Sequence, residues 1–308
     1  MKLNGNLLVL TQWSFKDALV QTYTLPYVEI IRQHLPPNRK IILVTSEQER
    51  LALTQEELRQ INLEWASRNM ELHTQGYTRY GWRKLVAFAG QFISLLKLIR
   101  KENIKAIHAF CTPAGSIGYL LSVLSRVPLV IDSFEPHAEA MVENGNWKPR
   151  SLPYRMLFYL EKKQAARARY LICAAEGMRE YASRKWGLDI SAKMFVKAAC
   201  VDRHQFSWRE KDPVRQQELG LQDKIVCIYA GKLGGIYYDK EVFSFLQSCH
   251  AYWGNRFRML MLTNTGRSVL DKSMQEAGVP TEILISLFVP HQQVPDYMAL
   301  ADFGITPV

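Results

Sequence analysis

The chain has 308 residues, of which 48% are hydrophobic, 22% charged and 11% aromatic. At roughly 100–200 residues per domain, this length suits two domains, and the composition excludes a disordered, collagen-like or coiled-coil chain. The formal charge is +10 at pH 7 and is concentrated in residues 1–190, which carry 26 basic and 17 acidic side chains. Neither a zinc finger nor an RNA-recognition motif accompanies this charge, so we expect no nucleic-acid partner. The apolar runs are shorter than the roughly 20 residues of a membrane span, and we predict a cytoplasmic protein.

Short apolar runs alternate with longer amphipathic stretches, which is typical of a parallel sheet covered by helices on both faces. In the first part of the chain the predicted strands are Leu7–Thr11, Lys40–Thr45, Met70–His73, Ala106–Phe110, Leu129–Ile131, Tyr170–Cys173 and Met194–Lys197. Thr54 and Glu57 have the spacing of a capping box and predict the start of a helix. A long helix is expected over residues 153–169, with Met156 on its packed face and Glu161 outside.

A polar, aperiodic stretch over residues 200–213 predicts a linker. It separates an N-terminal domain, residues 1–199, from a C-terminal domain, residues 200–308. The second domain has four predicted strands: Lys224–Ala230, Arg258–Leu262, Ile283–Val289 and Phe303–Thr306. The predicted fold class is α/β, with two Rossmann-like domains facing a cleft. Because no helix follows the last predicted strand, we expect the second domain to be incomplete and the chain to be part of a longer protein.

The first strand of the second domain leads into a glycine-rich segment, Gly231-Lys232-Leu233-Gly234-Gly235, and then into a helix beginning near Asp239. Glycines let backbone amides approach a phosphate closely, and a helix N-terminus adds partial positive charge to that of the lysine. The order of a Walker loop and the dinucleotide fingerprint are both absent. A tight turn without a ligand would use the same glycines. This segment alone therefore fits either a phosphate-binding loop or a simple turn.

Several segments, taken in order, resemble the GT-B glycosyltransferases of the retaining, nucleotide-sugar-dependent kind, the group 1 or family 4-like enzymes. Residues 167–187 resemble the strand and helix that close the first domain of this family. Residues 194–206 resemble its crossover into the donor domain, although Ala199-Cys200 replaces the usual Asn-Gly. The crossover positions that match are Val201, Asp202 and Phe206. Lys232 stands where the family has an arginine that grips the donor diphosphate.

The resemblance implies where the donor binds. The implied donor-binding residues are Gly231, Lys232, Gly234, Gly235 and Tyr237. The first strand of the family is usually followed by a Gly-Gly loop that lines the cleft, whereas this chain has residues 11–16 there. We therefore expect Ser14 or Lys16 to make the cleft contacts in place of glycine amides.

A second candidate segment follows the predicted strand at residues 129–131. Four side chains, those of Asp132, Glu135, His137 and Glu139, cluster on a loop that runs into a short helix, at the edge where ligands bind in open α/β sheets. His137 resembles the histidine that many GT-B enzymes place against the donor sugar, which implies a catalytic role for it. The alternative is that Glu135 and its neighbours only cap the helix, since acidic residues complement the dipole of a first turn.

Between Gly76 and Lys105, seven basic residues face a single acidic one, with Trp82, Phe88 and Phe92 among them. This pattern fits a solvated helix with an apolar core face. It also fits a surface that rests on anionic lipid headgroups or holds an acidic acceptor, because a basic rim and aromatic anchors favour both.

We therefore predict a glycosyltransferase that moves a sugar from a nucleoside-diphosphate sugar to a glycan or lipid-linked acceptor in polysaccharide biosynthesis. Histidines and cysteines lack ligand spacing, and Lys232 with the helix N-terminus would stabilise the departing diphosphate, so neither a metal nor another cofactor is predicted. Two alternatives remain: a non-hydrolysing nucleotide-sugar epimerase of the same architecture, and a non-catalytic two-lobed sugar-binding protein. The paired glutamates of the family would lie beyond Val308, so the chain by itself is expected to be inactive.

Overall fold

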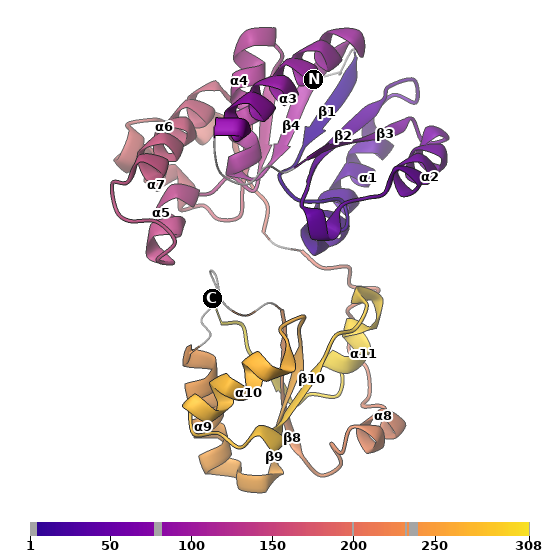
Figure 1. Ribbon diagram of the computed structural model, residues 1–308, viewed down its shortest axis with the longest axis vertical. Helices are drawn as coiled ribbons and strands as arrows, with labels where there is room; N and C mark the ends of the chain where they lie inside the picture. Colours follow the sequence, from indigo (N-terminus) through magenta and orange to yellow (C-terminus); the bar gives the residue numbers. More distant parts are fainter. Residues whose placement is uncertain (1–4, 77–81, 199, 232, 234–239, 308) are drawn as a thin grey trace. The chain divides into compact units, whose positions relative to one another are not determined.

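The structure is a computed structural model that describes residues 5–76, 82–198, 200–231, 233 and 240–307, with only the backbone described for residues 82–87. The chain divides into two compact units, Met1–Ala199 (unit 1) and Cys200–Val308 (unit 2). Each unit is built on a parallel sheet of its own (Figure 1).

Unit 1 contains a seven-stranded sheet in the order β3-β2-β1-β4-β5-β6-β7. Its strands are β1 (Asn6–Leu10), β2 (Ile41–Glu47), β3 (Met70–Gly76), β4 (Ile104–Phe110), β5 (Leu129–Asp132), β6 (Tyr170–Cys173) and β7 (Met194–Val196). All neighbouring strands run parallel. The order from β3 to β5 is that of a Rossmann sheet, in which ligands bind at the carboxyl ends of the strands.

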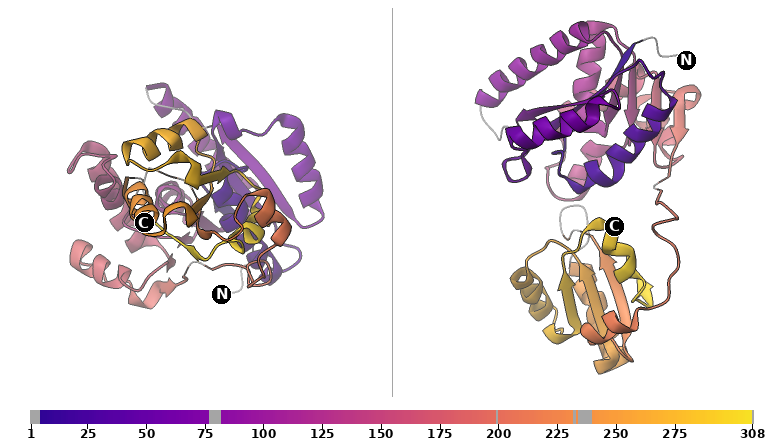
Figure 2. Two further views of the ribbon diagram at one scale, coloured as in Figure 1. Left: turned by 90° about the horizontal axis from the view of Figure 1, so that it is seen from below. Right: turned by 90° about the vertical axis from the view of Figure 1, so that its right-hand side faces the viewer.

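Helices cover both faces of this sheet (Figure 2). They are α1 (Leu25–His34), α2 (Gln55–Ala66), α3 (Trp82–Lys101), α4 (Thr112–Ser125), α5 (His137–Glu143), α6 (Leu152–Arg167) and α7 (Met178–Trp186). Alternate strand residues serve opposite faces: Leu8 packs in the core beneath α3, α4, α6 and α7, whereas Val9 packs beneath α1 and α2. A Cβ atom on Gly118 would lie 2.9 Å from Leu129 Cδ1, so glycine lets α4 approach the sheet closely.

Unit 2 contains a four-stranded sheet in the order β10-β9-β8-β11. Its strands are β8 (Ile225–Ala230), β9 (Phe257–Leu262), β10 (Leu284–Leu287) and β11 (Phe303–Gly304), and its helices are α8 (Pro213–Glu218), α9 (Lys240–Trp253), α10 (Arg267–Glu276) and α11 (Val294–Met298). Buried side chains of α9 and α10 fill the core on one face of the sheet. Leu221 and Leu300 belong to the core on the other face.

The predicted α/β fold class with two Rossmann-like sheets is confirmed, and a strand forms at each of the eleven predicted places. The capping box of Thr54 and Glu57 is also present at the start of α2. The predicted orientation of the helix over residues 153–169 is wrong: Glu161 is fully buried, whereas Met156 is 59% exposed. The buried face of α6 is made of small and polar side chains, because this helix lies close to α4 and α5.

Candidate functional site

An ion pair between a buried carboxylate and a half-buried lysine closes the carboxyl edge of the sheet in unit 1. Asp132 ends β5, and the ammonium of Lys197, directly after β7, lies 2.7 and 2.8 Å from its two carboxylate oxygens. The hydroxyl of Tyr23 donates a third hydrogen bond to Asp132, at 3.0 Å. The Lys197 ammonium also lies 3.4 Å from the centre of the Tyr27 ring. Since both charges are satisfied within the fold, this pair fixes the strand ends and is not a free acid or base.

His108 completes the surroundings of Asp132. Its Nε2 atom lies 3.5 Å from Asp132 Oδ2, a long contact, while its ring stacks on Phe110. Burial works to raise the pKa of Asp132, but His108 and Lys197 outweigh it and hold the pKa below its usual value. The carboxylate therefore stays charged inside the protein and keeps Lys197 in place.

The loop after β5 is held in a strained and rigid conformation. Ser133 and Cys111, which follow the neighbouring strands β5 and β4, both have positive φ angles, 51° and 68°. The Thr112 hydroxyl donates to the carbonyl of Glu135 at 2.9 Å and accepts from the amide of Glu135 at 3.3 Å. Left-handed backbone at residues other than glycine persists only where the surroundings enforce it, and it clusters at functional sites.

This loop presents the predicted catalytic residue. His137 is the first residue of α5, and its Nδ1 atom lies 2.9 Å from Oε1 of Glu135. A carboxylate only accepts, so Nδ1 carries the proton that is donated to Glu135, and in the neutral form of the ring Nε2 is an acceptor. The side chain of His137 is 30% exposed. The structure thus brings Glu135 and His137 together, and the carboxylate of Glu135 orients the ring of His137.

Glu161, which was predicted to lie on the exposed face of its helix, has a buried carboxyl group that supports the first turn of α5. Oε1 of Glu161 accepts a hydrogen bond from the backbone amide of Ala138, at 2.8 Å, in the first turn of α5. Its Oε2 atom has no hydrogen-bond partner among the described residues. Burial raises the pKa of Glu161 to about 8, and the negative charges of Glu139 and Glu135 add to this rise. Glu161, Gln164, Ala165 and the C-cap residue Ala168 follow the i, i+3, i+4, i+7 spacing of one helix face and are all buried, so this spacing was the available signal for the buried face of α6.

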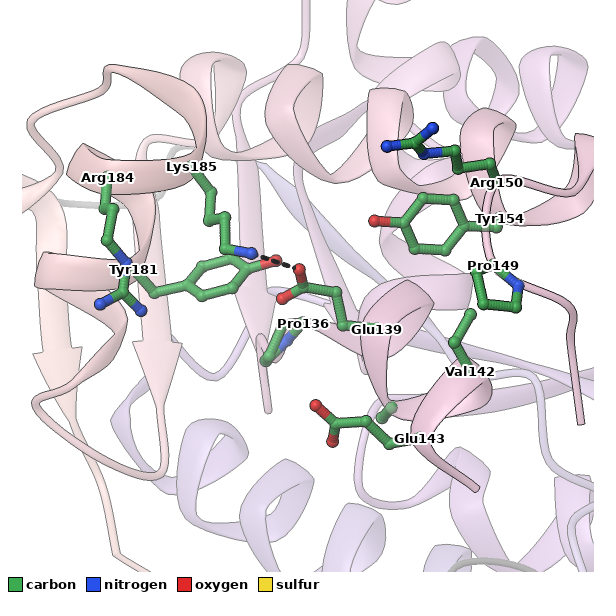
Figure 3. A pocket seen from close by; sticks show the side chains of 11 residues that line it. Pro136, Glu139, Val142, Glu143, Pro149, Arg150, Tyr154, Tyr181, Arg184 and Lys185 are labelled. Carbon is green, nitrogen blue, oxygen red and sulfur yellow. Dashed lines mark hydrogen bonds and ion pairs between the residues drawn. The ribbon is translucent and has the colours of Figure 1, made fainter. Parts of the chain in front are cut away.

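Next to His137, a pocket of about 610 Å³ opens between α5, the start of α6 and α7 (Figure 3). The predicted Glu139 lies in its wall, 2.8 Å from the ammonium of Lys185. Burial works to raise the pKa of Glu139, but Lys185 holds it below its usual value. Tyr154 and Tyr181 form aromatic parts of the wall. Because these residues come from three helices, sequence spacing gave no signal for the pocket.

The two remaining candidates of unit 1 are engaged in local contacts. Ser14 is fully buried, and its hydroxyl donates to the carbonyl of Ser46 and accepts from the amide of Gln48. The ammonium of Lys16 lies 2.7 Å from Oε1 of Glu57, the capping residue of α2. Both side chains therefore tie the loop after β1 to neighbouring elements.

The glycine segment of unit 2 is described only in part. Gly231 follows β8 and donates its backbone amide to the carbonyl of Leu262 at 2.9 Å. A Cβ atom at this position would lie 2.7 Å from the hydroxyl of the buried Tyr229 side chain, so glycine suits the position. The other predicted donor-binding residues lie outside the described residues: Lys232, Gly234, Gly235 and Tyr237.

Two features are absent from the described residues, a metal-binding cluster and a membrane-spanning helix. Groups of three or more side chains with metal-ligand chemistry are absent from this part of the chain. None of the helices described is both long and apolar enough to cross a bilayer.

The family model of the glycosyl transferase 4-like domain matches residues 40–195, half of the 308-residue chain. The chain belongs to the glycosyl transferase 4-like family. The predicted resemblance to the GT-B glycosyltransferases is therefore confirmed, and so is the prediction that this protein is a glycosyltransferase enzyme. No curated protein matches the sequence of this family member.

Solved structures similar to this glycosyltransferase have the GT-B fold. Alr3699/HepE from Anabaena in complex with UDP-glucose is 12% identical with a TM-score of 0.66, over 98% of this chain and 73% of that one. Sucrose-phosphate synthase from Thermosynechococcus elongatus is 12% identical with a TM-score of 0.70, over 98% of this chain and 75% of the other. A putative UDP-N-acetylglucosamine 2-epimerase from Listeria monocytogenes, also 12% identical, has a TM-score of 0.60, over 97% and 72% of the two chains. At such identities the likeness shows the fold alone.

Proposed function

We propose that this glycosyltransferase moves a sugar from a nucleoside-diphosphate sugar to the hydroxyl of a glycan or lipid-linked acceptor, as a step of polysaccharide synthesis. The observation that carries the proposal is the pair of His137 and Glu135, held on a strained loop at the carboxyl edge of the sheet. The similar Anabaena structures hold UDP-glucose or UDP, which supports a uridine nucleotide as the first donor to test.

In the transfer, the bond between the anomeric carbon and the diphosphate oxygen breaks, and the electron pair leaves with the nucleoside diphosphate. The acceptor oxygen bonds to the anomeric carbon, and its proton passes to the departing phosphate. Nε2 of His137 accepts a hydrogen bond from a sugar hydroxyl, and the negative charge of Glu135 stabilises the positive charge that develops on the sugar. Retention of the anomeric configuration is proposed from the family resemblance alone.

The donor diphosphate is assigned to the glycine segment of unit 2. Its proposed ligands are Gly231, Lys232, Gly234, Gly235 and Tyr237. Backbone amides and the charge of Lys232 suit a diphosphate and would remove the need for a divalent cation.

The test of this function is incubation of the full-length protein with a panel of nucleotide sugars, with and without glycan acceptors. Release of nucleoside diphosphate together with a glycosylated acceptor supports transfer, whereas an epimerised donor would support the epimerase alternative. Binding without any product would leave the sugar-binding alternative. The His137→Ala variant should lower kcat about 100-fold, whereas the matched control His34→Ala, on the exposed side of α1, should not.

We further propose a peripheral site on the cytoplasmic face of a membrane. A largely apolar groove between α3 and α4 is lined by Phe88, Phe92 and Leu124, among others. Phe88 and Leu124 are 40% and 61% exposed. The exposed cations Lys97, on α3, and Arg126, which caps the end of α4, lie on the same two helices. Helices that carry both an exposed apolar surface and basic side chains suit a membrane with anionic lipid headgroups.

A further inference from the structure

We propose that the pocket between α5, α6 and α7 is a binding site for an acidic sugar of the acceptor, that is, a sugar bearing a carboxylate or a phosphate. The assignment of this sugar to the acceptor rests on the proposed function. The binding site itself rests on the geometry of the pocket. Its volume of about 610 Å³ lies within the range of roughly 300–1,000 Å³ of sites that enclose small ligands.

Two tyrosine rings form walls that are fixed before any ligand arrives. Tyr154 stacks on Phe158 with ring centres 5.7 Å apart, and Tyr181 packs edge to face on Trp186 at 5.0 Å. Phe158 and Trp186 in turn contact each other at 6.1 Å, so one aromatic chain connects both walls. Figure 3 shows Tyr181 of α7 facing Tyr154 of α6 across the pocket. A sugar ring has an apolar face of C–H groups that packs on such rings, and rigid walls lower the entropic cost of binding.

Polar side chains near these rings can form hydrogen bonds with the hydroxyl groups of a sugar. Glu139 lies between the two tyrosines in Figure 3, with Lys185 fixed to it at 2.8 Å. Glu143 is a further acceptor at the end of α5. A carboxylate beside an ammonium offers an acceptor and a donor at a fixed separation, which suits neighbouring hydroxyls of a sugar.

The charge of the pocket favours an anion on that sugar. Three basic side chains line it against two acidic ones, and Glu139 pairs with Lys185. Arg184 is attached loosely to Glu180, at 3.4 Å. Arg150 forms no ion pair with any other described residue, and it occupies a left-handed conformation with a φ of 59° at the start of α6. Its guanidinium is therefore available to bind a carboxylate or phosphate with two parallel hydrogen bonds.

The first experiment measures binding without a donor. The protein is titrated by NMR with methyl glucuronide, glucose 6-phosphate and neutral methyl glucoside. Both acidic probes should bind about 10-fold more tightly than the neutral one, and the better of them identifies the acidic group. Arg150→Gln should remove this difference, whereas Arg155→Gln, an exposed change on the neighbouring helix α6, should preserve it.

The second comparison tests the aromatic wall. Tyr154→Ala should weaken binding of all three probes about 10-fold, whereas Tyr154→Phe keeps the ring and should retain most of the affinity. Equal affinity for acidic and neutral probes, or binding unchanged by both Arg150→Gln and Tyr154→Ala, overturns the proposal. Each variant is compared with wild type by its melting temperature, so that loss of folding is recognised.

Turnover separates this proposal from the proposed function. If the full-length protein binds the acidic probes but transfers no sugar, the binding site stands and the proposed function fails. If transfer occurs and Tyr154→Ala leaves the acceptor KM unchanged, the proposed function stands and the pocket is refuted as an acceptor site.

Discussion

The buried carboxyl of Glu161 makes the folding stability of unit 1 dependent on pH in an unusual direction. Burial raises its pKa from 4.5 to about 8, so the folded protein holds a proton that the unfolded chain releases. The stability contributed by the protonated form is fully present below pH 4.5 and is lost as the pH rises through about 8. At 1.36 kcal/mol per pKa unit, we expect the free energy of unfolding to fall by about 3–4 kcal/mol between pH 5 and pH 8.

The Glu161→Gln variant tests this reasoning. Glutamine keeps the shape and the acceptor for the amide of Ala138 but cannot lose a proton in this range. The free energy of unfolding of the variant should therefore not decrease in this way. Relative to wild type, the variant should become more stable by about 3–4 kcal/mol as the pH rises from 5 to 8.

Urea unfolding at several pH values, followed by tryptophan fluorescence, measures the difference between the two proteins. Other shifted carboxyls do not interfere, because the lowered pKa values of Glu57, Glu71, Asp132 and Glu139 place their titration below this range. The exposed control Glu143→Gln should follow the wild-type profile. Parallel profiles of wild type and Glu161→Gln would refute the assigned role of the buried carboxyl.

Three further predictions concern other charges. Lys197→Met should lower the free energy of unfolding by about 3–5 kcal/mol, because it leaves the buried carboxylate of Asp132 unpaired; adding Asp132→Asn should recover part of that loss in urea unfolding, and an unchanged midpoint for the single variant would contradict it. Lys232→Ala should weaken binding of a nucleoside diphosphate by about 1.5–3 kcal/mol and leave nucleoside binding almost unchanged in calorimetric titrations, so equal losses for both ligands would exclude a diphosphate contact. Changing Lys97 and Arg126 together to Gln should reduce partitioning onto anionic vesicles by about 2 kcal/mol at low salt without changing the melting temperature; wild-type protein that ignores such vesicles would disprove the membrane proposal.

The strands were predictable because buried parallel strands are nearly continuous apolar runs, such as Leu129–Asp132, and need no partner to be recognised. The capping box of α2 was predictable because both of its residues lie within one turn. The contact between His137 and Glu135 could also be predicted from the sequence, because the two residues are only two positions apart.

The contacts that complete the site join residues far apart in the chain. Lys197 meets Asp132 across 65 residues, and Lys185 meets Glu139 across 46. Glu161 was misplaced because a charged side chain in a helix is ordinarily solvated; the hydrogen bond from the backbone amide of Ala138 and the raised pKa lower the cost of burying it. Contacts of this kind depend on how all strands of the sheet are aligned with one another, and short sequence patterns carry no information about that alignment.

The position of β1 in the middle of the sheet has a consequence for synthesis of the protein. β1 leaves the ribosome before both of its neighbours, and the first of them, β2, follows within about 35 residues, as the pairing of Leu7 with Ile41 shows. Its other neighbour is β4, where Leu7 pairs with Ala106. At translation rates of roughly 5–20 residues per second, one edge of this apolar strand waits about 5–20 s for its partner. During that interval its unpaired amides and carbonyls could bind the strand of another nascent chain. We therefore expect nascent chains stalled before residue 104 to associate with chaperones, and chains that extend past β4 to be released from them.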